Sequence, residues 1–489
     1  MMNWRSVSAA VLVLAFSDAT ANGEWKPAGS PIATRWAKDV TPENVHAEYP
    51  RPQLVRQEWQ NLNGLWEYAI QPEKESSPGT FQGEILVPFP VESSLSGVGK
   101  TVGAENRLWY RRRFSIPKSW RGKRIKLNIG ACDWETTVWV NGSKVGEHRG
   151  GYDPFSFDIT NALKGDGEQE IVVGVWDPSD GGYQPRGKQV RKPEGIWYTP
   201  TTGIWQTIWL EPVAVGGIDE LRIVPDFDQS QICVTVTTTG DAEGVTVKAV
   251  LEDQIEVVSR AEGKASDTLI LQLSNPKPWS PSSPHLYDLG VEIIGADGKV
   301  LDVVESYAAL RKISLEKDAS GAKRMLLNGK PLFHFGPLDQ GFWPDGLYTA
   351  PTDEALKFDI EITKQLGFNM IRKHVKVEPA RWYYWCDKLG MLVWQDMPSG
   401  DAAAPWDPFG KYDGKELTRS AESAGNYHHE WENILRALQN VPSIVVWVPF
   451  NEGWGQFETV AVTKRVQELD PNRLVNCASG GNDFPVGDI

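Results

Sequence analysis

The feature that most constrains the fold is a change of pattern near residue 325. Before it, short runs rich in Val, Ile, Trp and Phe follow one another without a helical period. After it, apolar runs alternate with amphipathic helical segments. Strands alone imply β-sandwiches, whereas repeated strand–helix units imply a parallel sheet that closes into a barrel. A chain of 489 residues is long enough for about three domains.

The first half of the chain predicts two β-sandwiches of different size. Residues 56–213 contain regularly spaced strand candidates, and Asn141-Gly142 between two of them is typical of a tight hairpin turn. We expect a jelly-roll β-sandwich here. Residues 214–313 repeat the pattern on the scale of an immunoglobulin-like β-sandwich. Residues 22–55 are polar and contain proline, which favours an extended lead-in.

The N-terminus is typical of a secretory signal peptide over residues 1–21. Arg5 precedes a short apolar run, and Ala19-Thr20-Ala21 resembles a cleavage site. The run is too short to span a bilayer. We therefore expect a secreted or periplasmic protein. The net charge of −14 disfavours nucleic acids and anionic membranes as partners. The scattered cysteines have neither metal-site nor disulfide spacing, so we expect free buried thiols, no metal and no cofactor.

The second half predicts part of a (β/α)8 TIM barrel over residues 314–489. Strands are expected at residues 332–335, 368–372, 391–395, 444–448 and 474–477, with helices at 353–366, 379–389, 422–439 and 457–469. Thr352 is a candidate helix cap, and Gly367 and Gly390 are candidate helix stops. These units correspond to about strands 1–5 of eight. We therefore expect the barrel to be incomplete and the chain to be truncated at its C-terminal side.

The apolar run Ile444–Val448 ends at Pro449 and places three polar or aromatic residues directly after a buried strand. These residues are Asn451, Glu452 and Trp454. Barrel enzymes carry their chemistry at the carboxyl ends of such strands. The other interpretation is that Asn451 and Glu452 cap the following helix, because both residue types favour helix N-termini.

The order of several short segments resembles glycoside hydrolase family 2. The segments are Asn328-Gly-Lys-Pro331, Gly367–Arg372, Trp382–Gly390, Val393-Trp-Gln-Asp396 and Val445–Glu452. The resemblance covers nearly all of the chain from about residue 50, and the family includes β-galactosidases, β-glucuronidases and β-mannosidases. It implies an exo-acting retaining β-glycosidase that hydrolyses terminal O-glycosidic bonds of oligosaccharides or glycoconjugates. The alternative is a non-catalytic carbohydrate-binding protein or an inactive remnant.

The resemblance also implies roles for two residues after the fourth strand. Glu452 matches the acid/base, which protonates the glycosidic oxygen and then deprotonates the attacking water. Asn451 matches the residue that hydrogen-bonds the 2-hydroxyl of the sugar. The nucleophile of the family follows strand seven, and we expect it to be absent from this chain.

Other strand ends supply candidate substrate-binding residues, each with a structural alternative. Arg372 and His374 follow the second strand, and a salt bridge or a packed histidine is the alternative. Asp396 follows the third strand and can bind the sugar or cap a loop. Trp454 can wall a sugar site or pack in a core. Asp339 is a weaker candidate.

A loop of the expected jelly roll is a further candidate. Asp180-Gly-Gly-Tyr183 resembles a loop that reaches the barrel mouth in β-galactosidases, although plain turn chemistry explains it equally well. It is followed within residues 183–203 by the basic residues Arg186, Lys188, Arg191 and Lys192. This cluster can meet a uronic acid or remain solvated. The sequence identifies neither the sugar nor the oligomeric state.

Overall fold

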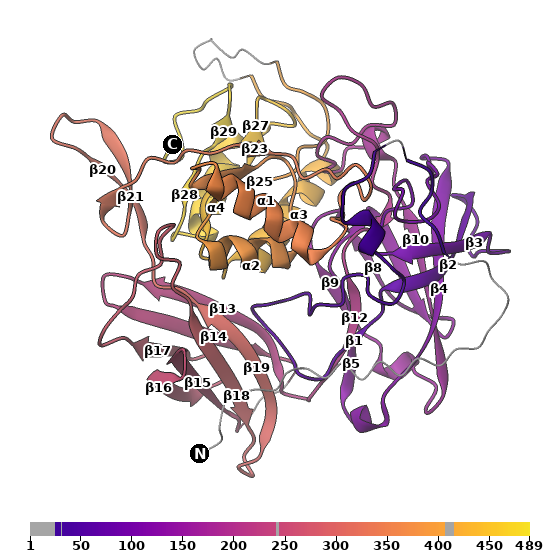
Figure 1. The fold of residues 1–489 in the computed structure, drawn as a ribbon, viewed down its shortest axis with the longest axis horizontal. Helices are drawn as coiled ribbons and strands as arrows, with labels where there is room; N and C mark the ends of the chain where they lie inside the picture. The colour runs from indigo at the N-terminus through magenta and orange to yellow at the C-terminus, as the bar shows by residue number, and fades with distance from the viewer. Residues whose placement is uncertain (1–24, 31, 241–243, 406–414) are drawn as a thin grey trace.

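The computed structural model describes residues 25–30, 32–240, 244–405 and 415–489. The expected signal peptide lies outside them. Figure 1 shows an all-β body formed by the first part of the chain, a smaller all-β body, and an α/β body that contacts both. In the described residues, no helix is long and apolar enough to cross a membrane.

The first body is a sandwich of two antiparallel sheets. Its inner faces enclose a core that includes Trp66, Leu127 and Val173. One sheet has the order β1 (Gln60–Asn61), β12 (Ile208–Val213), β5 (Arg124–Ile129) and β9 (Phe155–Asp158). The other has the order β3 (Gly83–Val87), β2 (Gly64–Pro72), β4 (Asn106–Ser115), β10 (Glu168–Trp176), β7 (Glu135–Val140) and β8 (Ser143–Arg149). This is the expected jelly-roll-type β-sandwich.

The hairpin between β7 and β8 has the turn that its sequence predicts. Asn141 and Gly142 take φ values of +51° and +82°. Both residues tolerate this left-handed region, so the strands can reverse within two residues. The remaining short elements of this body are β6 (Cys132–Asp133), β11 (Gly203–Ile204), η1 (Ala37–Asp39), η2 (Lys118–Trp120), η3 (Thr160–Ala162) and η4 (Ser179–Gly181).

The second body is an immunoglobulin-like sandwich. The sheet β13 (Ile218–Asp226), β14 (Gln231–Thr238) and β17 (Thr268–Gln272) packs on the sheet β16 (Glu256–Lys264), β15 (Thr246–Asp253), β18 (Tyr287–Ile294) and β19 (Val300–Ala308). Alternate residues of β14 are buried because every second side chain faces the partner sheet. A sheet of β20 (Ile313–Lys317), β21 (Lys323–Leu327) and β22 (Lys330–Pro331) follows, and its first hairpin projects from the molecule (Figure 1).

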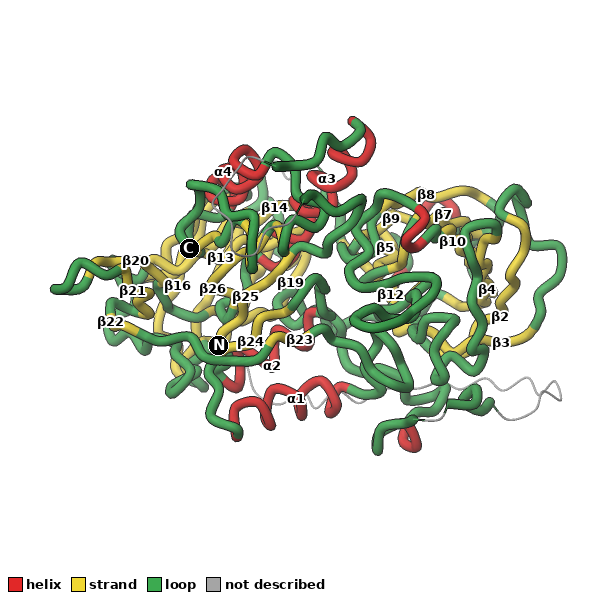
Figure 2. Tube along the Cα trace, turned by 90° about the horizontal axis from the view of Figure 1, so that it is seen from above, coloured by secondary structure: helices red, strands yellow, loops and turns green. Residues whose placement is uncertain are grey.

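The third body has the expected parallel strands, with helices between them. The sheet order is β23 (Leu338–Asp339), β24 (Met370–Lys373), β25 (Leu392–Asp396), β26 (Ile444–Val448) and β28 (Leu474–Val475). β27 (Phe450–Asn451) and β29 (Ala478–Ser479) pair beyond it. The helices are α1 (Asp353–Gln365), α2 (Ala380–Leu389), α3 (Ala421–Leu438) and α4 (Thr459–Leu469). Figure 2 shows the strands beside these helices.

The first strand of this sheet is displaced from its expected position. Residues 332–335 are not a strand, and pairing with β24 begins only at Leu338. The physical reason is the exposure of the earlier segment. Phe333 and Phe335 are 80% and 55% exposed. Large apolar side chains make this segment look like a buried strand in the sequence, but apolar residues can also lie on the surface.

Local signals explain how two of the helices begin and end. The Thr352 hydroxyl accepts a hydrogen bond from the Ala355 N–H at 3.2 Å, which satisfies a donor at the start of α1. Gly390 ends α2 with φ at +73°, and Gly367 follows α1 with φ at +92°. Both glycines accept a left-handed backbone that would strain other residues.

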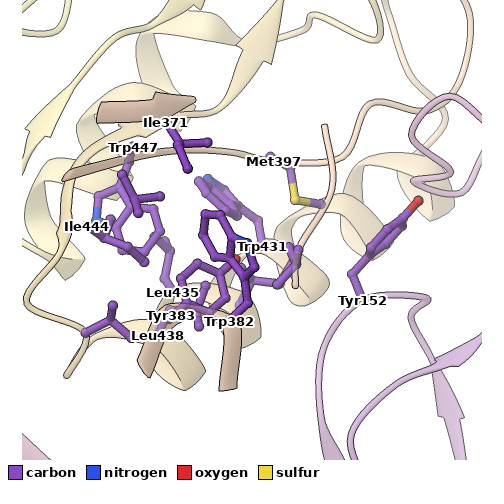
Figure 3. Packing of buried hydrophobic residues seen from close by; sticks show 14 of the residues in the cluster. Tyr152, Ile371, Trp382, Tyr383, Met397, Trp431, Leu435, Leu438, Ile444 and Trp447 are labelled. Atoms are coloured by element: carbon purple, nitrogen blue, oxygen red, sulfur yellow. The ribbon is translucent and has the colours of Figure 1, made fainter. Parts of the chain in front are cut away.

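The core of the α/β body is aromatic. Trp447 of β26 meets Trp431 of α3 edge to face, with ring centroids 5.7 Å apart. Trp382 and Tyr383 of α2 complete the layer between sheet and helices (Figure 3). Tyr152 of the jelly roll belongs to the same buried cluster. The barrel part and the sandwich therefore share one continuous core.

Candidate active site

Consecutive strands place three of the predicted side chains in one network. Arg372 of β24 donates from Nε and Nη2 to the two carboxylate oxygens of Asp396, at 3.0 and 2.8 Å. The same Nη2 donates to Asn451 Oδ1 at 2.8 Å. Parallel pairing of β24 with β25 and of β25 with β26 brings these strand ends side by side. The planar guanidinium holds both partners at once, which an ammonium group cannot do in this geometry.

His374 joins the network through the same carboxylate. Its Nδ1 lies 3.2 Å from Asp396 Oδ2, and the Val375 N–H donates to that oxygen at 3.3 Å. A carboxylate acceptor favours the proton on Nδ1 of the ring. Asp396 is 1% exposed, so its charge depends on these donors for stabilisation. The sequence indicates Arg372, His374 and Asp396 as three separate candidates, and the structure shows that they contact one another.

Glu452 stands at the tip of a tight turn. The Trp454 N–H donates to Asn451 O at 2.9 Å, and the two residues between them, Glu452 and Gly453, have φ values of +53° and +75°. The Glu452 N–H also donates to Ser479 O at 3.0 Å, which ties the turn to β29. A left-handed glutamate is sparsely populated and persists only where the surroundings hold it. Such positions are enriched in functional sites.

The side chain of Glu452 is exposed at the carboxyl ends of the strands. Among the described residues, no ion pair within 4.0 Å involves its carboxylate. The turn does not cap the next helix either, because α4 begins at Thr459 with Glu458 before it. Gly480, with φ at +88°, lies against the side chain, and a Cβ placed there would come within 3.0 Å of Glu452 Cγ. Glycine at this position therefore leaves room for the carboxylate.

A loop of the jelly roll reaches the same strand ends. Pro185 forms a β-bridge with Gly400, and the N–H groups of Arg186 and Gly187 donate to Ser399 O at 2.9 and 3.0 Å. Gly187 has a φ of +57°, and a Cβ on it would lie 2.5 Å from Val375 O. The approach is so close that only glycine fits. Residues 184–188 are therefore docked beside β24 and β25.

Two tryptophans lie where this loop meets the turn of Glu452. The rings of Trp197 and Trp454 meet edge to face with centroids 4.9 Å apart, and both side chains are partly exposed. The Arg186 guanidinium lies 5.4 Å from the Trp454 ring centroid, and Lys188 Nζ lies 5.9 Å from that of Trp197. Burial lowers the pKa of Lys188, and the negative charge of Glu452 opposes that shift.

Two other candidates have carboxylates that are paired outside this network, although the carbonyl oxygen of Asp339 accepts from the His374 N–H at 2.8 Å. Asp180 accepts hydrogen bonds from Nε and the backbone N–H of Arg191, at 2.7 and 3.0 Å, within its own loop. Asp339 accepts from Lys373 Nζ at 2.6 Å and from the Gly341 N–H at 2.8 Å. None of the described contacts joins either carboxylate to Arg372 or Asn451.

A cavity of about 400 Å³ lies elsewhere, between the lead-in, the two sandwiches and the flank of the barrel helices. Its lining includes His46, Trp209, Arg381 and Asn433, but none of the strand-end residues described above. Among the described residues, no group of three or more His, Cys, Asp or Glu side chains is arranged to hold a metal ion. We therefore assign the candidate active site to the network at the strand ends.

Comparison with known proteins identifies the family. Residues 87–199 match the model of the glycosyl hydrolases family 2 sugar binding domain, residues 217–311 that of glycosyl hydrolases family 2, and residues 321–489 that of the family 2 TIM barrel domain. The three models follow one another along the chain. The chain belongs to glycoside hydrolase family 2.

Individual family members are distant in sequence. A β-glucuronidase of Paenibacillus borealis is 25% identical over 87% of this chain and 74% of its own length. A β-galactosidase of Thermoanaerobacter pseudethanolicus is 28% identical over 70% of this chain and 44% of its own length. The crystal structure of Ruminococcus gnavus β-glucuronidase superposes with a TM-score of 0.71 at 22% identity, covering 88% of this chain and 74% of that one. The chain thus spans only part of the length of these family 2 proteins.

Some residues of this family 2 site were not singled out by sequence reasoning. Trp197 lies inside the basic loop, and an aromatic residue among cations is a sequence signal that could indicate it. The basic cluster is visible in the sequence, but only the structure separates Arg186 and Lys188, at the strand ends, from Arg191, which pairs with Asp180. Gly480 carries no signal in a single sequence, because its role depends on a contact with Glu452.

Proposed function

We propose that the protein is an exo-acting retaining β-glycosidase in which Glu452 is the acid/base. The observation that supports this most directly is the exposed Glu452 at the end of β26, held in a left-handed turn beside the Arg372–Asp396–Asn451 network. In this role Glu452 protonates the departing glycosidic oxygen and later removes a proton from the attacking water. Family membership supports the same reaction class.

The network supports roles for its other members. Asn451 is 4% exposed, and its Oδ1 accepts from Arg372, which directs Nδ2 away from the guanidinium. Among the described residues, Nδ2 has no acceptor, so it is free to donate to the 2-hydroxyl of a bound sugar. That hydrogen bond strengthens as the oxocarbenium-like transition state develops. Arg372, Asp396 and His374 hold Asn451 and line the sugar site, and Trp454 forms one wall.

Retaining hydrolysis requires a second carboxylate about 5–5.5 Å from the first. In this family the second carboxylate follows the seventh strand of the barrel. The parallel sheet of the described residues has five strands, β23, β24, β25, β26 and β28, so we assign no nucleophile among these residues. The proposal therefore concerns the protein encoded by the complete reading frame that contains residues 1–489. Residues 1–21, with the pattern of a secretory signal peptide, support export of that protein.

The test compares Glu452→Gln with the unchanged protein on a series of aryl β-glycosides of graded leaving-group pKa. An amide cannot donate the proton, so glycosylation should slow most for poor leaving groups, by about 100-fold or more, and least for activated ones. Azide should restore turnover of activated substrates, because it needs no general base. Glu458→Gln is the control, since Glu458 is an exposed glutamate of the same segment outside the network.

Two results would contradict the proposal. Equal losses for all leaving groups without azide rescue would remove the proton-transfer role of Glu452. Sugar binding without hydrolysis of any aryl glycoside by the complete protein would instead favour a non-catalytic carbohydrate-binding protein.

A further inference from the structure

The loop that reaches the strand ends carries two cations whose hydrogen-bonding capacity is unused. Lys188 is only 8% exposed. No described residue accepts a hydrogen bond from its Nζ, and no described carboxylate lies within 4.0 Å of it. Nε and Nη1 of Arg186 are buried and also lack acceptors among the described residues. Buried guanidinium donors without an acceptor are more costly than neutral ones, so those of Arg186 mark a group that a ligand can satisfy, whereas Lys188 Nζ keeps some access to solvent.

Other cations of the same loop do not share this property. Arg191 forms an ion pair with Asp180 at 2.7 Å, and Lys192 is exposed. Lys188 and Arg186 therefore differ from an ordinary solvated basic loop. The Arg186 guanidinium lies over the ring of Trp454 of the barrel part, and Glu452 of the same turn is the charge that acts on Lys188.

The surroundings of these two cations have the chemistry of a sugar site. Arg186 lies near the rings of both Trp197 and Trp454, at 5.9 and 5.4 Å from their centroids. Partly exposed indoles offer flat apolar faces to the C–H groups of a pyranose. Glu452 is the anion that acts on Lys188 most strongly, but its side chain is exposed while that of Lys188 is buried.

We propose that Lys188 and Arg186 are specificity-determining residues that bind an anionic group, a carboxylate or sulfate, carried by the glycoside at this site. Charge-assisted hydrogen bonds from an ammonium and a guanidinium satisfy such a group, and they are stronger than the neutral bonds that a sugar hydroxyl would make. The negatively charged protein would otherwise repel such a substrate, so the jelly-roll domain supplies the local positive charge. The inference rests on the proposed sugar site but does not require hydrolysis.

The test measures binding to the 489-residue chain by calorimetry, with tryptophan fluorescence as a second readout. The probes are methyl β-D-glucuronide, methyl β-D-glucoside and 4-carboxyphenyl β-D-glucoside. The first two differ only at C6, which is a carboxylate in the glucuronide and a hydroxymethyl group in the glucoside, and the third carries its carboxylate on the leaving group. We expect one of the two anionic probes to bind at least 10-fold more tightly than the neutral glucoside, and the identity of that probe locates the anion.

Lys188→Met keeps the length of the side chain and removes its charge. It should weaken binding of the preferred anionic probe by about 10- to 100-fold and leave the neutral probe within about 3-fold. Lys192→Met is the matched control, because it removes one charge from the exposed part of the same loop. Arg186→Gln tests the second cation if Lys188→Met fails to fold.

Equal affinity for charged and neutral probes, absence of binding by all three, or equal losses in Lys188→Met and Lys192→Met would each overturn the inference. The first result would leave the glycosidase proposal intact. Conversely, loss of the Glu452 effect together with a preserved preference for the anionic probe would leave this inference standing alone.

Discussion

At the scale of residues, the site depends on one buried carboxylate and the arginine that neutralises it. Asp396 is 1% exposed and receives two hydrogen bonds from Arg372 and one from the backbone of Val375. Removing the cation from such a pair leaves an uncompensated buried charge. The pair therefore has a structural role and also orients Asn451.

The chain offers a control with the same geometry in a different environment. Arg111 makes the same two-point contact with Glu67, at 2.7 and 2.8 Å, but the two side chains are 28% and 42% exposed. We predict that Arg372→Met lowers the free energy of unfolding by about 3–5 kcal/mol, and Arg111→Met by less than about 1 kcal/mol. Denaturant titration of both variants checks this. Equal losses would show that burial does not set the difference.

At the scale of elements, helix ends contribute to how the barrel part contacts its neighbours. Gly390 ends α2, and a Cβ on it would lie 2.7 Å from the carbonyl oxygen of Pro281. Gly367 follows α1 with a similar positive φ, but a Cβ there would meet nothing within 4 Å. The two positions share backbone strain and differ in packing.

The two glycines therefore allow packing to be separated from strain. We predict that Gly367→Ala destabilises the barrel part by about 1 kcal/mol through the positive φ alone. Gly390→Ala should cost a further ~1–3 kcal/mol, because the backbone of Pro281 must move. Tryptophan fluorescence during chemical denaturation measures both. A Gly390→Ala effect no larger than that of Gly367→Ala would rule out the contact as a source of stability.

The elements of the barrel were largely predictable from sequence, and the reasons are local. Thr352 acts through its hydroxyl on a nearby N–H group, and Gly367 and Gly390 act through their own backbone, so α1 and α2 match their predicted ranges within a few residues. The strand before α1 was misplaced because an apolar run does not reveal which of its residues pair. The site was only partly predictable. Arg372, Asp396 and Asn451 follow from strand ends, but the approach of Lys188 depends on how two domains dock.

At the scale of the whole molecule, a buried aspartate links the immunoglobulin-like body to the barrel part. Asp387 of α2 accepts hydrogen bonds from Tyr307 Oη of β19 at 2.7 Å and from the Ser443 N–H at 2.8 Å. Trp279 Nε1 donates to its backbone carbonyl at 2.8 Å. Burial raises the pKa of Asp387 to about 7, although these hydrogen bonds oppose the shift.

This pKa predicts a pH dependence with a definite sign. Between pH 4 and 7 the folded state keeps a proton on Asp387 that the unfolded chain releases, so stability falls as pH rises through this window. Asp387→Asn removes that dependence, while its amide oxygen can still accept from Ser443 and its NH₂ can donate to Tyr307.

We predict that Asp387→Asn gains stability relative to the unchanged chain as pH rises from 4 to 7, by up to about 4 kcal/mol. Denaturant titrations at a series of pH values measure the difference, and taking the difference cancels the contributions of other buried acids. A difference that is constant over this range would show that Asp387 does not titrate there.

The bridge between Pro185 and Gly400 has an evolutionary consequence. The loop that carries Arg186 and Lys188 is encoded within one sandwich, but its side chains lie above strands encoded about 200 residues later. Recombination that exchanged the first sandwich between two related genes would therefore change the charge facing Glu452 without altering a single residue of the strands that hold it. Under the proposed function, shuffling of domains would change the substrate preference and leave Glu452 and its strands unchanged.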